Sequence, residues 1–197
     1  MMTSGDYDGA INNAVEGLRS NKNAKGKQDY VYMLEESFAK AKERDLRNIN
    51  AWFKDANPQN LEKIYNTYVQ LNYRQELIRP LLPLKLIKEG RDAIFPFDDY
   101  SDQIVSSKNS LSKYLYDNSK ALLINKDKLV IRRAYDDLVY LESLSPGYKD
   151  VNKLIDELAT IALVEHDAHL RFMVRAKRGN AQQGLALLEV LTQREHP

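Results

Sequence analysis

The chain has 197 residues, which suits one domain of ordinary size and is short for two. Its 29 Lys and Arg residues nearly balance its 28 Asp and Glu residues, so the excess of positive charge typical of nucleic-acid-binding proteins is absent. The sequence contains no Cys, which excludes disulfide bonds, thiolate zinc sites and a cysteine nucleophile. We therefore expect neither nucleic acid nor a cofactor among its ligands.

The first half of the chain shows helical periodicity. Gly and Pro together number only 14, so there are few helix breakers. Apolar residues recur at helical spacing from Tyr7 to Leu18 and again from about Gln28 to Lys54, where the pattern predicts a helix of about seven turns. Asn57-Pro58 predicts an interruption and a new helix start, because Pro suits a first helical turn. A further stripe then follows over residues 61–71.

The second half continues this pattern after an irregular segment. Pro80 and Pro83 predict that residues 77–89 form either a kinked helix or two short pieces, and residues 90–102 are expected to be the longest loop. Helical spacing returns over residues 104–122, 129–141 and 151–162, and no segment shows the alternation of a strand. The sequence therefore predicts an all-α fold.

Two segments resemble tetratricopeptide repeats. Gly5-Asp6-Tyr7-Asp8-Gly9-Ala10-Ile11 is similar to the start of that family's second helix, and Ala134, Leu138, Leu141 and Pro146 follow its spacing. Ala10 and Ala134 are not separated by a multiple of the family's period of about 34 residues. The resemblance implies stacked antiparallel helix hairpins, a tetratricopeptide-like α-solenoid that is irregular in the middle, over residues 1–163.

Three longer segments resemble uncharacterised helical lipoproteins from the cell envelope of Bacteroidetes: NLEKIYNTYVQLNYRQELIRPLLPL, FPFDDYSDQIVSSK and RRAYDDLVYLESLSPGYKDVNKLIDEL. This resemblance covers roughly residues 5–160 and implies an envelope scaffold or a binding role. As written, the chain starts without a secretory signal or a lipidated Cys, which predicts a cytoplasmic protein. An N-terminally truncated lipoprotein would instead belong to the cell envelope or periplasm. No apolar run reaches the roughly 18–20 residues of a transmembrane helix.

Two patterns suggest metal chemistry, and each has a simpler interpretation. Asp98-Asp99-Tyr100-Ser101-Asp102 matches DDxxD, with which helical prenyl-transfer enzymes hold magnesium-bound diphosphate, but a second acidic cluster is not evident. We interpret these aspartates as loop and helix-capping residues, because Pro96 precedes them. His166 and His169 would share a helical face, yet two histidines without a third ligand are weak evidence for zinc.

A non-catalytic binding function follows as the leading expectation. The sequence has no G-x-S-x-G elbow and no glycine-rich phosphate loop. Tyrosines at helical spacing are candidate groove residues for an unidentified protein or peptide partner, although most such aromatics pack between helices. Trp52 and Phe53 are interpreted as core anchors. The alternative is a structural subunit that self-associates through the ends of the array. The candidate partner-binding residues are Tyr65, Tyr68, Tyr135 and Tyr140.

Residues 164–197 differ in composition from the rest of the chain. They hold all three histidines, one of the 18 aromatic residues and one of the 17 lysines. Residues 173–191 are similar to the start of a type IV pilin-like precursor, but the apolar helix that such a precursor needs ends after Leu191. We therefore expect 164–197 to be a fused or frame-shifted end, either an atypical helical appendage or a poorly packed one.

Overall fold

The fold is all-α, as the sequence predicts. The computed structural model describes residues 5–124 and 127–164, and it describes side chains up to residue 159. Every predicted helical stripe coincides with a helix. The helices are α1 (Tyr7–Arg19), α2 (Gln28–Asp55), α3 (Leu61–Ile78), α4 (Ser101–Leu122), α5 (Lys128–Leu144) and α6 (Val151–Val164).

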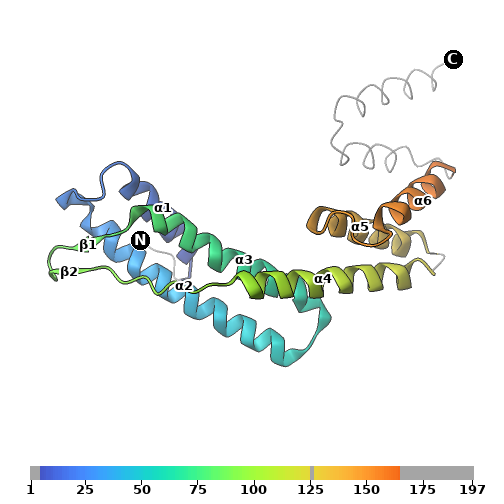
Figure 1. Cartoon of the computed structure of the whole chain (residues 1–197), viewed down its shortest axis with the longest axis horizontal. Coiled ribbons are helices and arrows are strands. Elements are labelled where there is room, and N and C mark those ends of the chain that lie inside the picture. The colour runs from blue at the N-terminus through green and yellow to red at the C-terminus, as the bar shows by residue number, and fades with distance from the viewer. Residues whose placement is uncertain (1–4, 125–126, 165–197) are drawn as a thin grey trace, which may run out of the picture. The chain divides into compact units, whose positions relative to one another are not determined.

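The chain separates into two compact units. Unit 1 comprises residues 1–111 and unit 2 comprises residues 112–197, so the division falls inside α4 (Figure 1). The predicted boundary at 163/164 stays a prediction. His166, His169 and the pilin-like segment lie outside the described residues.

In unit 1, α1 and α2 form an antiparallel hairpin. Asp8, near the start of α1, lies beside Arg44, whereas Gly17, near its end, lies against Tyr30. A Cβ atom at Gly17 would approach the Tyr30 ring to 2.9 Å, so the absence of a side chain allows the close approach of the two helices. The buried core between these helices and the segment after α3 consists of Ile11, Ala14, Val15, Leu18, Val31, Leu34, Phe38, Ala41, Ile78, Leu81, Leu84 and Leu86.

The turn between α2 and α3 follows the predicted Asn-Pro signal. The side chain of Asn57 accepts a hydrogen bond from the Gln59 amide at 3.0 Å, and a short 3-10 turn over Pro58–Asn60 leads into α3. Trp52 packs against a second core formed by Ile49, Ile64, Leu71 and Tyr100, as predicted. The prediction for Phe53 is wrong, because its side chain is 55% exposed at the end of α2.

A buried charge network joins α1, α2 and α3. Arg74 is 3% exposed and donates hydrogen bonds to Asp8 and Asp45, both at 2.6 Å. Arg44 donates to the other oxygen of Asp45. Burial by itself would raise the pKa of Asp8, but the hydrogen bonds and positive charges of Arg74 and Arg44 outweigh it and hold this pKa below its usual value.

The segment after α3 differs from both predicted forms. α3 ends at Ile78, a 3-10 turn covers Arg79–Leu81, and a short antiparallel hairpin follows. Its strands are β1 (Lys85–Leu86) and β2 (Arg91–Asp92), with Lys85 opposite Asp92. The two prolines end the helix as expected, but strands this short leave no alternating pattern in a sequence.

An extended strap, which we define as residues 93–100, links β2 to α4. Its backbone is held by side chains from the helices. The Gln75 amide both donates to the Asp98 carbonyl and accepts from the Asp98 N–H, each at 2.8 Å. Glu35 accepts from the Ile94 N–H at 2.6 Å, and Lys42 donates to the Pro96 carbonyl. These bonds replace the ladder that a neighbouring strand would provide.

In unit 2, polar contacts connect the C-terminal half of α4 to the helices that follow. Ser112 and Ser145 share a hydrogen bond of 2.9 Å, and the Asn118 amide donates to Asp137 at 3.1 Å. Ser112 precedes Asn118 in α4, whereas Ser145, directly after α5, follows Asp137, so α4 and α5 run antiparallel. The buried apolar residues of α5 and α6 are Ala134, Tyr135, Leu138, Leu141, Val151, Ile155 and Leu158.

Candidate functional site

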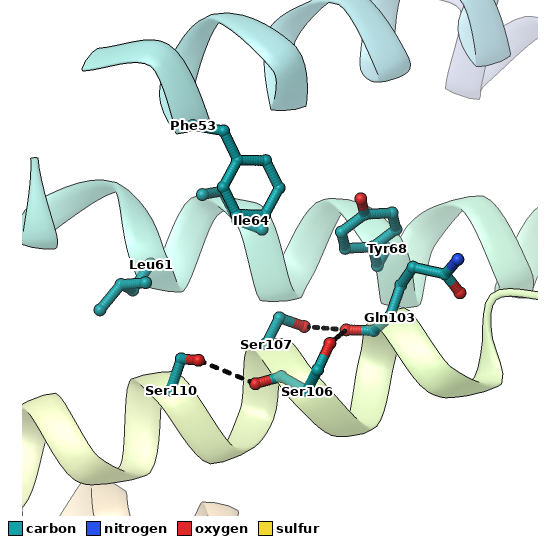
Figure 2. A pocket seen from close by; sticks show the side chains of 8 residues that line it. All are labelled: Phe53, Leu61, Ile64, Tyr68, Gln103, Ser106, Ser107 and Ser110. Carbon is teal, nitrogen blue, oxygen red and sulfur yellow. Dashed lines mark hydrogen bonds between the residues drawn. The ribbon is translucent and has the colours of Figure 1, made fainter. Parts of the chain in front are cut away.

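The candidate site is an open pocket in unit 1, where the end of α2, the start of α3 and the first half of α4 meet (Figure 2). Its volume is about 160 Å³. One side is apolar or aromatic and consists of Phe53 from α2 with Leu61, Ile64 and Tyr68 from α3. The other side is α4, which contributes Gln103, Ser106, Ser107 and Ser110.

The start of α4 is fixed by the aspartates of the DDxxD pattern. Asp99 accepts a hydrogen bond from the Ser101 amide at 2.9 Å, which caps the helix as predicted. Asp98 instead forms an ion pair with Lys42 at 2.6 Å and accepts a hydrogen bond from the Tyr100 hydroxyl. Among the residues that the structure describes, no group of three or more His, Asp or Glu side chains is arranged to hold a metal ion.

Small side chains on α4 leave room for the pocket. Three serines of α4 share one face of the helix, because the last follows the first two by four and three residues. They are Ser106, Ser107 and Ser110. Ser106 and Ser107 donate to the Gln103 carbonyl and Ser110 donates to the Ser106 carbonyl, at 2.6–3.2 Å (Figure 2). Because each serine proton is used within the helix, these three hydroxyls can accept hydrogen bonds from a ligand but not donate one to it.

Tyr68 and Tyr100 keep their protons well above neutral pH. Their ring centroids are 6.0 Å apart. Burial raises the pKa of Tyr68, and burial, followed by the hydrogen bond to Asp98, raises the pKa of Tyr100 well above its usual range. The hydrogen bond from Lys42 holds the pKa of Asp98 below its usual value. None of the eight lining residues is therefore a base at neutral pH.

Two pairs match the S-x-x-K spacing in which some hydrolases use a lysine to activate a serine. They are Ser37 with Lys40 and Ser110 with Lys113. Lys40 donates to Glu36 and Lys113 donates to Asp117, each at 2.6 Å, and these hydrogen bonds raise the pKa of both ammonium groups. A general base needs a lowered lysine pKa, so this shift is opposite to the one that catalysis requires.

The predicted partner-binding tyrosines are divided between the two units. Tyr68 lines the pocket, and Tyr65, on the same helix, is partly buried outside its lining. Tyr135 is 4% exposed inside unit 2, which makes it a packing residue, and Tyr140 is partly buried in the same unit. The α4 residues of the pocket were not predicted from the sequence. The spacing of Ser106, Ser107 and Ser110 does indicate a helical face of small side chains.

Two further findings concern membrane-spanning segments and related proteins. Within the described helices, none combines the length and the apolar character needed to cross a bilayer. The resemblance to tetratricopeptide and envelope lipoprotein families, like the solenoid arrangement, stays a prediction. A search of protein-family models, curated proteins and solved structures finds nothing that matches this chain.

Proposed function

We propose that the protein is a non-catalytic binding protein that takes an apolar side chain of a partner protein or peptide into the unit 1 pocket. The observation that carries this proposal is the position of Phe53. Its ring stands 55% exposed at the rim of a pocket whose floor is apolar. Aromatic residues, Phe among them, are more frequent at the centre of protein interfaces than on the rest of the protein surface.

The size of the pocket supports a side chain as ligand rather than a substrate molecule. Pockets for small molecules and cofactors usually measure about 300–1,000 Å³. The volume here is about 160 Å³, which suits one or two apolar side chains. The lining also has no base at neutral pH, and the hydroxyl protons of its three serines are bonded within α4, so a binding role agrees better with its chemistry than a catalytic one.

Peptides selected from a random-sequence display library test this function. We expect the selected peptides to share an apolar or aromatic anchor residue. Phe53→Ala removes the rim and Ser110→Trp fills the pocket, so each is expected to weaken peptide binding about tenfold or more. Isothermal titration calorimetry measures the affinities, and circular dichroism verifies that the variants fold.

Tyr73→Ala is the matched control, because Tyr73 is an aromatic residue of α3 that is 50% exposed and does not line the pocket. Peptides whose binding survives both pocket substitutions would contradict the proposal. Analytical ultracentrifugation adds a second test. A concentration-dependent dimer that Phe53→Ala abolishes would assign the pocket to a second copy of this chain instead.

A further inference from the structure

Two segments that are far apart in sequence form one surface at an end of unit 1. These are the loop between α1 and α2 and the β1–β2 hairpin, which Figure 1 shows side by side. The Gln28 side chain donates to the Lys85 carbonyl at 3.0 Å and accepts from the Ile87 N–H at 2.8 Å. Lys22 donates to the Leu81 carbonyl at 2.7 Å. These contacts fix the hairpin against the start of α2.

This surface has a local excess of positive charge. Residues 22–29 and 85–92 together contain six basic and three acidic side chains, whereas the whole chain has a formal net charge of only +1. Arg91 is neutralised by Glu35 at 2.7 Å and by Glu89. The ammonium group of Lys22 is occupied by backbone carbonyls.

Four lysines remain available on this surface. Within residues 5–124 and 127–164, none of them forms an ion pair with a carboxylate. Lys27 instead lies 5.1 Å from the centre of the Tyr30 ring, which attracts the ammonium group but does not neutralise its charge. We call these residues the lysine cluster: Lys25, Lys27, Lys85 and Lys88.

The turn of the hairpin adds an apolar side chain between two of these lysines. Ile87 is 51% exposed and lies next to Lys88, whereas its neighbour Leu86 is fully buried in the core. The Glu89 N–H closes the turn by donating to the Leu86 carbonyl at 3.2 Å. The buried neighbour and the closed turn together hold Ile87 outward beside the lysines.

We propose that the lysine cluster and Ile87 bind an anionic membrane surface. Lysines near an anionic bilayer are attracted to lipid phosphates, and their aliphatic stems reach along the interface. An apolar residue at the centre of such a cluster enters the boundary between headgroups and acyl chains. Binding to an acidic protein would explain the lysines but not the exposed Ile87. Binding to an anionic membrane explains both, because the lysines meet lipid phosphates and Ile87 enters the apolar boundary.

Vesicle sedimentation of the full chain tests this inference. We expect binding to vesicles of three parts phosphatidylcholine to one part phosphatidylglycerol, and none to phosphatidylcholine alone. Reversing the four lysines of the cluster to Glu is expected to lower the affinity about 500-fold or more, since each lysine contributes about fivefold. Ile87→Ser is expected to lower it about fivefold. Binding should disappear when the salt concentration rises from about 0.05 M to about 0.5 M.

The control variant reverses the same number of charges elsewhere, at Lys54, Lys108, Arg132 and Arg133. It is expected to bind anionic vesicles almost as well as the native chain. Equal losses in the two variants would show that overall charge alone causes binding and would overturn the inference. Binding of the native chain to a polyglutamate peptide but not to the vesicles would overturn it as well, in favour of an acidic protein partner.

Discussion

Arg74 is a cation placed among three helices of unit 1 with almost no access to water. Moving a guanidinium group out of water is costly, and Asp8 and Asp45 offset this cost through hydrogen bonds of 2.6 Å. Asp45 is itself buried. Each of the two aspartates contacts both Arg74 and Arg44, so the loss of Arg74 removes the more deeply buried of the two cations that each carboxylate contacts.

The substitution Arg74→Met tests this dependence. It leaves the buried Asp45 with Arg44 as the remaining one of its two arginine partners, so we expect the free energy of unfolding to fall by about 3 kcal/mol, the lower end of the range for a broken buried ion pair. Urea denaturation measures the change. Arg79→Met is the control, because Arg79 is 58% exposed, pairs with Glu76 on the surface and lies 5.3 Å from the centre of the Phe97 ring, and its loss is expected to cost about 1 kcal/mol. Equal effects would contradict the role of burial.

The pKa of Asp8 predicts a pH dependence. It is lower in the folded state than the ordinary value of 3.8, so the unfolded state takes up this proton first as the pH falls. The stabilisation by Asp8 is therefore complete above about pH 4 and is lost as the pH falls through the folded-state pKa. We expect Asp8→Asn to be less stable than the native chain at about pH 6, and this gap to narrow at about pH 3. A gap that stays constant with pH would contradict the prediction.

Individual residues in the pocket were only partly predictable. Tyr68 was found because its spacing marks a helical face, and it lines the pocket. Phe53 has the same apolar character as Trp52, and the sequence gives no sign that α2 extends far enough past its partners to leave Phe53 exposed. Exposure at a helix end depends on where the neighbouring helices stop, which is a tertiary property.

At the scale of elements, glutamine side chains act as backbone partners. Gln28 bonds both a carbonyl and an N–H of the hairpin, and Gln75 does the same for the strap. The side-chain amide of Gln has an N–H donor and a carbonyl acceptor, as a peptide group has. It can therefore form the two backbone hydrogen bonds that a neighbouring strand would otherwise form with an extended segment. This arrangement lets an extended chain lie against helices while side chains satisfy part of its backbone.

Gln75→Ala tests this role. The substitution leaves the Asp98 carbonyl and N–H without their partner, so we expect a loss of about 1–3 kcal/mol in the free energy of unfolding and faster hydrogen exchange at the Asp98 amide. NMR-detected exchange measures the second effect. Gln70→Ala is the matched control on the same helix, since no hydrogen bond of its side chain is described, and it is expected to change stability by about 0.5 kcal/mol or less.

The helices were predictable because each repeats an apolar stripe over several turns. The 28 residues of α2 carry such a stripe, which only the buried Asp45 interrupts between Ala41 and Ile49, and Asn57-Pro58 follows its end. The hairpin was not predictable, because strands of two residues show no period. The position of the strap depends on side chains more than 20 residues away, which a local pattern does not encode.

At the scale of the whole molecule, the two compact units predict separable unfolding. The single Trp of the chain, Trp52, lies in unit 1 and reports on that unit alone. Leu138→Ala removes a fully buried side chain from unit 2 and is expected to destabilise that unit by about 2–5 kcal/mol. In the unfolding curve from circular dichroism, the part that belongs to unit 2 should then move to lower denaturant concentration. The midpoint from Trp52 fluorescence should stay unchanged.

Leu34→Ala is the complementary variant, because Leu34 is fully buried in unit 1. It is expected to lower the midpoint of the fluorescence transition. If Leu138→Ala lowers the fluorescence midpoint as much as Leu34→Ala does, the two units unfold as one cooperative body and the prediction is wrong.

The strap also imposes an order on folding. Its hydrogen-bond partners Glu35, Lys42 and Gln75 belong to two different helices, and the contact between Ile94 and Glu35 spans 59 residues of chain. A segment whose partners are side chains on other elements gains little until those elements are in place, since loop closure costs entropy before any contact forms. We therefore expect the strap to become ordered after α2 and α3 have paired, so that the pocket-forming start of α4 is among the last parts of unit 1 to assemble.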